Sequence, residues 1–470
     1  MHLVPKHTKP GDPPKYRIIE HASHPKKPLP SGVTSVNHNL DPNQFKCSWT
    51  GLDQIKSFFL PFHDRREVRV LGLDFRNGFE HVGVDTKVRH RLCLSWKGKI
   101  YVRKVAPFGV RTTPGEFGNL VDATKEILEK VFAGRLKVIN QVDDLAIAFI
   151  DPTLKLEEVL ELLKELGWEV NEEKTQALTR KPIHDGIEWD LDELTMSLPK
   201  EKKEKYRLKV VALLRKGKKH GVTLKEVESL VGSLQYVCRI VPKHRTNLRP
   251  LYRLRNQFHN EYATRHLENQ HLKTLDWWNR FLSSPRISSS FGPPPPLLHG
   301  TFACDASNVA IGIFLQLDGS STPLVAKFDL DPTWREKHDA YIGNAEAWSV
   351  EALVEALVRL GVRNRSVRIV CDNSNVDEAW SKGWSKNALL NLSIVRLLDL
   401  SFTFNLYLTL DWIESAKNPA DAISRNVFPS GTVQLDSSSR PFNPPGSAGG
   451  SDPRLLSTKF MASLQEEKEA

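Results

Sequence analysis

Apolar and polar residues follow two different periods along the first half of the chain. Short apolar runs typical of strands occur in REVRVLGLDF (66–75), KIYVRKVAPFG (99–109) and VINQVDDLAIAFI (138–150). Residues 115–133 have a helical period instead, and their predicted apolar side consists of Phe117, Leu120, Val121, Ile127, Leu128 and Val131. A second helix, LEEVLELLKELG (156–167), ends at a glycine, which suits a helix C-terminus. This mixture predicts an α+β domain.

The second half of the chain contains two patterns separated by the proline-rich segment FGPPPPLLHG (291–300). Before it, residues 200–255 predict basic helices, with ten Lys/Arg and two Glu between Lys200 and Lys219. After it, strand-like and helical runs alternate from Thr301 to about Phe428, which predicts a compact α/β domain. Its longest helix is NAEAWSVEALVEALVRL, with a predicted buried stripe of Ala347, Val350, Leu353, Val354 and Leu357. Proline runs are stiff, so the segment is a predicted domain boundary.

Charge and cysteine content narrow the class of protein only slightly. The net charge of +10 and the isoelectric point of about 9.2 favour a polyanionic partner, but a merely basic protein fits them equally well. The five cysteines are scattered without zinc-ligand spacing, so we expect reduced thiols in an intracellular protein. No apolar stretch approaches the roughly 18 residues of a membrane span, so no membrane partner is expected.

Two sets of acidic residues stand where regular elements are predicted to end. Asp74 closes the apolar run VRVLGLD, and Asp143 and Asp144 lie between two strand-like runs. Adjacent carboxylates repel each other unless a cation compensates them. An Asp-Asp pair considered alone is more often simply a turn. Two-metal nucleotidyl transfer is the chemistry that needs several such carboxylates close together.

The second set lies beyond the proline segment. Asp305 and Asp372 each follow a strand-like run, and Glu346 lies in the long helix. Asn418, followed by Pro419, is the predicted N-cap of a further helix with Asp421 in its first turn. A single aspartate at a strand end is more often structural. Four acids in such positions fit a two-metal hydrolase.

These motifs resemble a known family. LGLDFRNGF, KVAPFGVRTTPGEF, QVDDLAIAF and LGWEVNEEKT resemble the successive palm motifs of retroelement reverse transcriptases, and KYRIIEHASHP with SVN resembles the fingers segment of the DIRS-like branch. DAS, the glutamate of the long helix, CDN and NPADAISR resemble retroelement ribonuclease H domains. The resemblance implies an α+β right-hand polymerase with fingers, palm and thumb, followed by an α/β ribonuclease H-like domain.

The resemblance also implies domain boundaries. They are partial fingers at 1–62, a palm with a primer-grip hairpin at 63–199, a thumb at 200–260, a connection and proline linker at 261–299, a ribonuclease H-like domain at 300–428 and a disordered tail at 429–470.

The roles of individual residues follow from the same resemblance. The implied metal ligands are Asp74, Asp143 and Asp144 in the first site and Asp305, Glu346, Asp372 and Asp421 in the second, which are also the catalytic carboxylates. Each site would hold two Mg²⁺ ions, with Mn²⁺ as a substitute. The resemblance also implies that Lys174 is a general acid near pyrophosphate and that Arg17 binds the triphosphate. Phe79 would pack against the sugar, and Phe108 and Gly109 would contact the template and the incoming nucleotide.

The implied activity is RNA-directed and DNA-directed DNA synthesis with ribonuclease H activity in a retrotransposon. Its partners would be an RNA template, a DNA primer, RNA–DNA hybrid and dNTPs. Three departures from the family pattern stand out: Gln141 replaces an aromatic residue, the fingers are short, and the histidine usual before Asp421 is missing. A decayed or domesticated copy that binds nucleic acid without catalysis is one alternative. A basic structural or capsid-like nucleic-acid binder is another.

Overall fold

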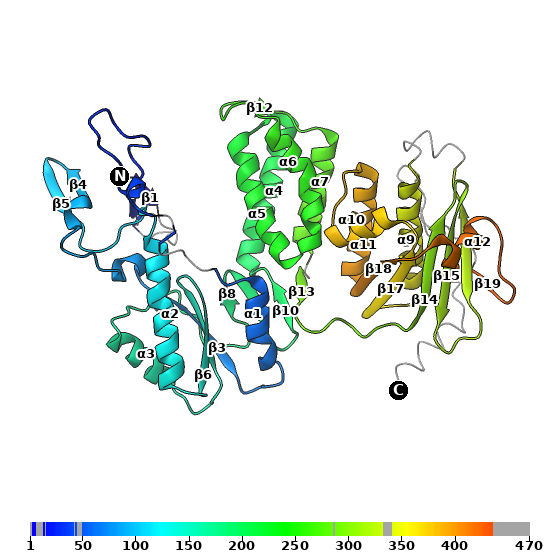
Figure 1. The fold of residues 1–470 in the computed structure, drawn as a ribbon, viewed down its shortest axis with the longest axis horizontal. Helices are drawn as coiled ribbons and strands as arrows, with labels where there is room; N and C mark the ends of the chain where they lie inside the picture. The colour runs from blue at the N-terminus through cyan, green and yellow to red at the C-terminus, as the bar shows by residue number, and fades with distance from the viewer. Residues whose placement is uncertain are drawn as a thin grey trace. The chain divides into compact units, whose positions relative to one another are not determined.

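The computed structural model describes residues 2–5, 13–14, 16–41, 43–44, 49–284, 287–331 and 341–435, and they form two units. Unit 1 comprises Met1–Pro199 with Ser288–Gly292, and unit 2 comprises Lys200–Ile287 with Pro293–Ala470. Figure 1 labels most of their longer helices and strands. No described helix is long and apolar enough to cross a membrane.

The centre of unit 1 is a three-stranded antiparallel sheet in the order β3-β7-β6 (Figure 1). Its strands are β3 (Arg69–Asp74), β7 (Asp144–Phe149) and β6 (Leu136–Gln141). The helices α2 (Thr113–Val131) and α3 (Leu156–Glu165) contribute to the same apolar core. Almost every residue of β7 is buried, as expected for the middle strand of a covered sheet.

The predicted apolar side of α2 is partly wrong. Phe117, Val121 and Leu128 are buried, four and seven residues apart along one face. Leu120 and Val131 are 41% and 59% exposed, because the helical rotation carries both away from that face. The predicted second helix is confirmed as α3, and Gly167 follows its end with a positive φ of 85°.

Smaller elements surround the central sheet of unit 1. They are β1 (His2–Pro5), β2 (Tyr16–Ile19), η1 (Val36–His38), α1 (Leu52–Phe59), η2 (Leu60–Phe62), η3 (Gly78–His81), η4 (Arg89–Arg91), β4 (Cys93–Trp96) and β5 (Lys99–Val102). A four-stranded sheet in the order β13-β10-β9-β8 completes the unit. Its strands are β8 (Ile183–His184), β9 (Ile187–Asp190), β10 (Thr195–Ser197) and β13 (Ser288–Ser290). The strand β13 comes from the segment predicted as connection, so the chain returns to unit 1 before the prolines.

Unit 2 begins with a group of helices. They are α4 (Lys200–Lys219), α5 (Leu224–Ile240), η5 (Pro242–Leu248), α6 (Arg249–Asn256) and α7 (Asn269–Ser283), with the short strands β11 (Val222–Thr223) and β12 (Thr264–Arg265) between them. Thr223 caps α5 through a hydrogen bond from the Glu226 backbone, while the Glu226 carboxylate accepts from the Thr223 backbone. This reciprocal pair fixes where α5 begins.

The rest of unit 2 is a six-stranded mixed sheet in the order β18-β17-β14-β15-β16-β19. The strands are β14 (Gly300–Ala306), β15 (Ala310–Leu317), β16 (Leu324–Asp329), β17 (Arg365–Cys371), β18 (Leu406–Trp412) and β19 (Val433–Gln434). The helices are α9 (Ile342–Arg359), α10 (Ser374–Lys382), α11 (Ala388–Phe404) and α12 (Asp421–Ser424), with the turn η6 (Ser415–Lys417). Strands β14 to β16 are antiparallel, and β14, β17 and β18 are parallel.

Different helices cover the two faces of this sheet. Helix α9 belongs to the large core on one face, and every residue of its predicted buried stripe is buried. Helix α12 packs on the opposite face through Ala420 and Ile423. The close approach requires Gly312, because a Cβ there would lie 2.5 Å from the Ser424 nitrogen. Strand β19 pairs with β16, so the prediction of disorder from residue 429 is wrong for its start, and residues 436–470 lie outside the described residues.

The helices of unit 2 also pack against its sheet domain through a polar and aromatic contact. His244 is buried beside Trp277, Phe281 and Phe402, and burial lowers its pKa to about 4. The Lys243 ammonium lies 3.7 Å from the centre of the Trp380 ring, and burial lowers its pKa to about 8. The predicted thumb and ribonuclease H-like regions therefore form one compact unit.

Candidate functional site

Backbone pairing brings the first set of carboxylates together. Strands β3 and β7 place Asp74 directly opposite Asp144. Strands β6 and β7 join through a tight turn in which Gln141 pairs with Asp144, and Val142 has a positive φ of 57°. Asp143 therefore lies at the tip of this turn. We call Asp74, Asp143 and Asp144 the first acidic site.

Donors from the chain itself occupy two of these carboxylates. The Asp74 Oδ2 atom accepts hydrogen bonds from Lys174 Nζ at 2.9 Å and from Asn171 Nδ2 at 3.1 Å. The Asp144 Oδ2 atom accepts from the Asp185 backbone nitrogen at 2.6 Å. The structure thus places Lys174 at the first acidic site. The role implied for it by the resemblance is at the pyrophosphate. Neither Asn171 nor Asp185 has a role predicted from the sequence.

The carboxyl of Asp143 has a raised pKa. Its residue is exposed at the turn, yet the surrounding protein desolvates the carboxyl and raises its pKa, and repulsion from Asp74 and Asp144 adds to this shift. Among the described residues, the ligand atoms of Asp74, Asp143 and Asp144 do not all lie within 4.8 Å of one another. The first acidic site is therefore assembled but open.

A buried histidine adjoins the first acidic site. His184, at the end of β8, is fully buried, and its Nδ1 atom lies 3.7 Å from Asp144 Oδ1. Neither ring nitrogen has a hydrogen-bond partner among the described residues. His184 was not predicted from the sequence, since a single histidine before a turn that contains glycine does not indicate which residues will lie next to it.

The aromatic residues predicted to contact the nucleotide lie together in unit 1, next to Gly109. The Phe79 and Phe108 rings have centroids 4.7 Å apart, and Phe79 is half-buried. Gly109 has a φ of +108°, and a Cβ there would lie 2.0 Å from the Glu20 carbonyl oxygen, so a glycine is required. The Asn37 side chain holds this loop, donating to the Gly109 carbonyl and accepting from the Arg111 nitrogen.

Arg17 and Gln141, two further residues noted in the sequence, also lie in unit 1. Arg17 lies in β2, opposite Val4, but its side chain is outside the described residues. The Gln141 side chain accepts a hydrogen bond from the Thr50 nitrogen at 2.8 Å. The residue that departs from the family pattern thus links the turn to the segment that precedes α1.

The second set of acids converges in unit 2. Asp305 lies near the end of β14, Asp372 follows β17, and Glu346 lies in the first turns of α9. Ligand atoms of these three carboxylates all lie within 4.8 Å of one another. Together with Asp421 they are called the second acidic site below.

The electrostatics of the second acidic site favour a bound cation. Burial raises the pKa of Glu346 to about 9, and repulsion from Asp305 and Asp372 contributes. Burial likewise raises the pKa of Asp305 to about 6, against the opposing hydrogen bond from Ser424. Glu346 Oε2 and Asp372 Oδ1 are buried without a partner among the described residues. Oxygen ligands with uncompensated negative charge are the donor set that Mg²⁺ prefers, so the residues present fit that ion.

Helix α12 supports this site, but its start differs from the prediction. The helix begins at Asp421 with Ala420 as N-cap, so Asn418 is not the cap. The buried Asn418 instead donates to the Cys304 carbonyl and accepts from the Ala420 nitrogen. Pro419 therefore precedes the helix, and Asp421 lies in its first turn as predicted.

Three neighbours of the second acidic site were not recognised from the sequence. The Ser424 hydroxyl donates to Asp305 Oδ2 at 2.5 Å, and the Ser415 hydroxyl donates to Asp372. Arg425 donates to both oxygens of Asp421 over 2.9–3.1 Å. The four-residue spacing of Asp421 and Arg425 was the available signal, because such residues meet on a helix.

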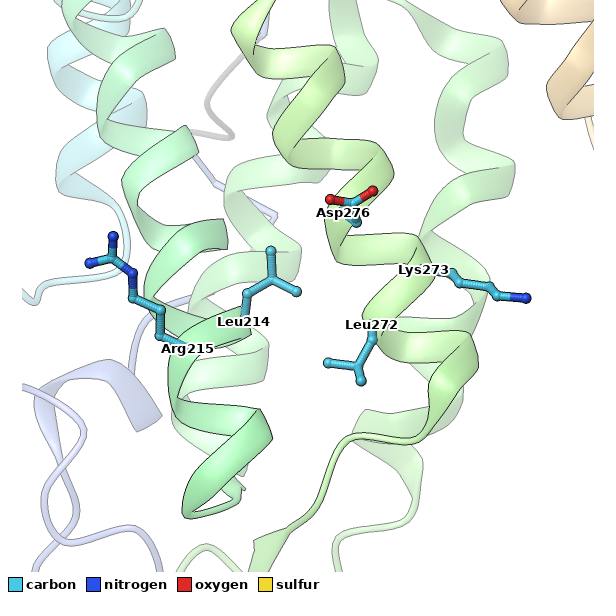
Figure 2. Close-up of a pocket in the computed structure, with 5 residues that line it drawn as sticks. All are labelled: Leu214, Arg215, Leu272, Lys273 and Asp276. Atoms are coloured by element: carbon cyan, nitrogen blue, oxygen red, sulfur yellow. The ribbon is translucent and has the colours of Figure 1, made fainter.

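The basic helix α4 directs only part of its charge outward. The Lys202 ammonium lies 3.8 Å from the centre of the Tyr236 ring, and Lys203 donates to the Ser284 carbonyl at 2.9 Å. Lys205 and Arg215 are exposed. A groove of about 340 Å³ lies between α4 and α7. Figure 2 shows the residues that line it, Leu214, Arg215, Leu272, Lys273 and Asp276. The groove contains no residue of either acidic site.

Comparison with known proteins identifies the first part of the chain. Residues 4–213 match the sequence model of the family described as reverse transcriptase (RNA-dependent DNA polymerase). The chain therefore contains a reverse transcriptase domain, with the α+β polymerase fold that the motif order predicted. The comparison with curated proteins finds no match.

Similar solved structures come from the foamy viral protease-reverse transcriptase. A complex with RNA/DNA hybrid has 17% identity and a TM-score of 0.38, covering 83% of this chain and 47% of that chain. A dRH form with double-stranded DNA has 17% identity and a TM-score of 0.44, covering 87% and 64%. A further complex with double-stranded DNA has 17% identity and a TM-score of 0.40, covering 87% and 77%. The chain spans less than two thirds of the first two.

Proposed function

We propose that this chain is an RNA-directed and DNA-directed DNA polymerase with ribonuclease H activity, encoded by a retrotransposon of the DIRS-like branch. Its substrates are an RNA template, a DNA primer, the RNA–DNA hybrid and dNTPs. The observation that supports the synthesis activity is Asp74 opposite Asp144 beside the turn of Asp143, within a reverse transcriptase domain. The branch rests on the order of the sequence motifs.

For DNA synthesis, Asp74, Asp143 and Asp144 would hold Mg²⁺, which would supply the positive charge that lowers the pKa of a 3′-hydroxyl and stabilises a leaving pyrophosphate. Lys174 lies at 2.9 Å from Asp74 and is long enough to turn its ammonium to the pyrophosphate, where it donates a proton. Phe79 packs against the sugar and excludes a 2′-hydroxyl. Phe108 and Gly109 support the template and the incoming base, and Arg17 binds the triphosphate.

For hybrid cleavage, Asp305, Glu346, Asp372 and Asp421 would hold Mg²⁺, which would supply the positive charge that activates water and stabilises a leaving oxygen. Ligand atoms of two buried acids and the half-buried Asp372 within 4.8 Å support this role, because burial and repulsion from the neighbouring acids keep Glu346 protonated at neutral pH unless a cation binds. Asp421 completes the set from α12, where Arg425 now holds its carboxylate. Ser424 and Ser415 orient Asp305 and Asp372.

Primer extension on poly(rA)·oligo(dT) with Mg²⁺ tests the polymerase. The wild-type chain is expected to extend the primer, and Asp143→Asn is expected to abolish extension because it removes a metal ligand. Lys181→Gln is a matched surface control, since Lys181 pairs with Asp190 outside the first acidic site. A folded Asp143→Asn protein that extends normally would remove the first acidic site from the mechanism.

A copy that binds nucleic acid without catalysis is the second candidate. Two observations on the first acidic site favour it. The carboxylate oxygens of its three aspartates do not all lie within 4.8 Å of one another, and Asp74 accepts hydrogen bonds from Lys174 and Asn171. The same assay separates the two functions. Retained binding of primer–template without extension, over a range of Mg²⁺ and Mn²⁺ concentrations, would favour this second candidate.

A further inference from the structure

A strongly basic segment of unit 1 has no role in either acidic site. Residues 86–111 contain eight Lys/Arg and no Asp or Glu. Arg103 pairs with Glu20 and Arg89 donates to the Val84 carbonyl. The six other cations of the segment are exposed and form no ion pair with any described carboxylate, namely Lys87, Arg91, Lys97, Lys99, Lys104 and Arg111. Most of this charge therefore remains available to a polyanion.

Within this segment, β4 and β5 form a hairpin with a defined shape. Trp96 pairs with Lys99, and the turn residues Lys97 and Gly98 have φ values of +49° and +71°. Two consecutive positive φ values are the geometry of a type I′ turn, which matches the twist of a hairpin. The two strands form a sheet of their own, and Figure 1 shows them apart from the central sheet of unit 1.

The register divides the hairpin into two faces. Leu94, opposite Tyr101, and Trp96, opposite Lys99, share one face because opposed residues of antiparallel strands point the same way. We call these four residues the aromatic face. Trp96 and Tyr101 are 49% and 47% exposed. The other face presents Ile100, which is 75% exposed.

Two occupants of the aromatic face compete on physical grounds. A second copy of the chain would bring two surfaces of the same positive charge together, which is unfavourable. Nucleic acid complements that charge. Exposed aromatic rings beside lysines and arginines are the feature by which proteins bind single strands, since unpaired bases stack on the rings while phosphates contact the cations. Duplex DNA keeps its bases stacked and offers the rings only its backbone.

We propose that the aromatic face of the β4–β5 hairpin binds unpaired nucleotides by base stacking, as a single-strand site for the template outside its duplex with the primer. The identity of the strand as template rests on the proposed function. Trp96 and Tyr101 stack on bases, and Lys99 contacts a phosphate. Base stacking is tolerant of sequence, so the site has no base preference.

The test compares binding to two DNA substrates in the full chain. One is a blunt primer–template duplex, and the other carries a 5′ single-stranded template extension. The paired change Trp96→Ala with Tyr101→Ala is expected to weaken binding of the extended substrate by about tenfold or more, because each lost stacking contact costs at least several-fold in affinity. Blunt-duplex binding is expected to stay unchanged. Ile100→Ala, on the opposite face of the same hairpin, is the matched control.

A second measurement does not depend on variants. A template extension containing 5-iodouracil should photocrosslink to Trp96 or Tyr101 in the wild-type chain, as mapped by mass spectrometry. Unchanged binding of the extended substrate by the double variant, or crosslinks confined to other residues, would overturn the proposal. Equal loss on the blunt duplex would also overturn it, since the face would then act on duplex. A change in sedimentation mass in the double variant would assign the face to self-association instead.

The proposal and the proposed function fail in different ways. A wild-type chain that crosslinks through this face but never extends a primer would contradict the polymerase activity alone. A chain that extends primers normally, with extended-substrate binding unaffected by the double change, would contradict the single-strand site alone.

Discussion

The two acidic sites compensate their clustered negative charge in different ways. In the first, Lys174 and Asn171 donate to Asp74, and Asp143 is exposed at a turn. In the second, burial and mutual repulsion raise the pKa values of Asp305 and Glu346 to about 6 and about 9. The first site can therefore remain assembled without a metal. The second must take up either protons or a cation at neutral pH.

The largest expected effect concerns Lys174, the lysine that donates a hydrogen bond to Asp74 of the first acidic site. Lys174→Ala should slow primer extension by about 10²–10⁴-fold, the usual contribution of a general acid. Hybrid cleavage should not change, because Lys174 belongs to unit 1 and the second acidic site to unit 2. Lys181→Ala is the control lysine. Wild-type extension rates in Lys174→Ala would mean that Lys174 only balances the charge of Asp74.

A smaller effect is expected for the sugar specificity of the first acidic site. Phe79→Val should lower the preference for dNTPs over rNTPs by at least about tenfold, a loss of about 1.4 kcal/mol in discrimination. The ring packs on Phe108 and Phe117, so trimming it makes room for a hydroxyl. Single-nucleotide incorporation measures the ratio, with the buried Phe132→Val as the control for a loosened core. Unchanged selectivity in an active variant would place the Phe79 ring in the core alone.

The second acidic site should make stability depend on pH and Mg²⁺ together. The pKa of Glu346 is about 9 in the folded protein against 4.5 for the free side chain, so the folded state binds the extra proton. This contribution to the free energy of unfolding is complete below pH 4.5 and is lost as the pH rises toward about 9. Mg²⁺ replaces the protons, so it should raise the melting temperature of unit 2 more at about pH 8 than at about pH 5.

Glu346→Gln should abolish most of this Mg²⁺ response and raise the melting temperature without metal at neutral pH. Each kcal/mol corresponds to about 2–4 °C for a unit of this size. Glu355→Gln is the matched control on the same helix, since burial raises the pKa of Glu355 to about 7 outside the second acidic site. A Mg²⁺ response that is independent of pH, or retained in Glu346→Gln, would contradict the comparison.

The smallest expected effect concerns helix α4, the basic helix of the predicted thumb. Because Lys202 and Lys203 have contacts inside unit 2, Lys205→Gln alone should flatten the salt dependence of primer–template binding as much as the triple change Lys202→Gln, Lys203→Gln and Lys205→Gln. The expected change is about 0.9 in the slope of log affinity against log salt. A larger change in the triple variant would show that the other two lysines leave their partners to bind phosphate.

Sequence patterns predicted the elements whose residues are buried along one regular face. The stripe of α9 and the acids at the ends of β14 and β17 needed only local periodicity. On α2, the apolar residues Leu120 and Val131 fall outside the buried face, because composition does not fix helical rotation. Strand β13 consists of serines and pairs with β10, a contact of long sequence separation that no local pattern indicates.

The residues of the candidate sites were likewise predicted only in part. The seven carboxylates were predicted from their positions after strands and in helices, aided by the family resemblance. Asn171 and Ser424 were missed, because a polar side chain acquires its role only when the fold brings it to a carboxylate. His184 likewise meets Asp144 across two separate sheets of unit 1.

The most direct test of two independent carboxylate sites is a crossed measurement of both activities. Primer extension and cleavage of a labelled RNA–DNA hybrid are measured for Asp143→Asn and Asp372→Asn in the same preparations, with folding checked by circular dichroism. Asp143→Asn should lose extension and keep cleavage, and Asp372→Asn should keep extension and lose cleavage. Loss of both activities in either folded variant, or cleavage retained in Asp372→Asn, would contradict the account.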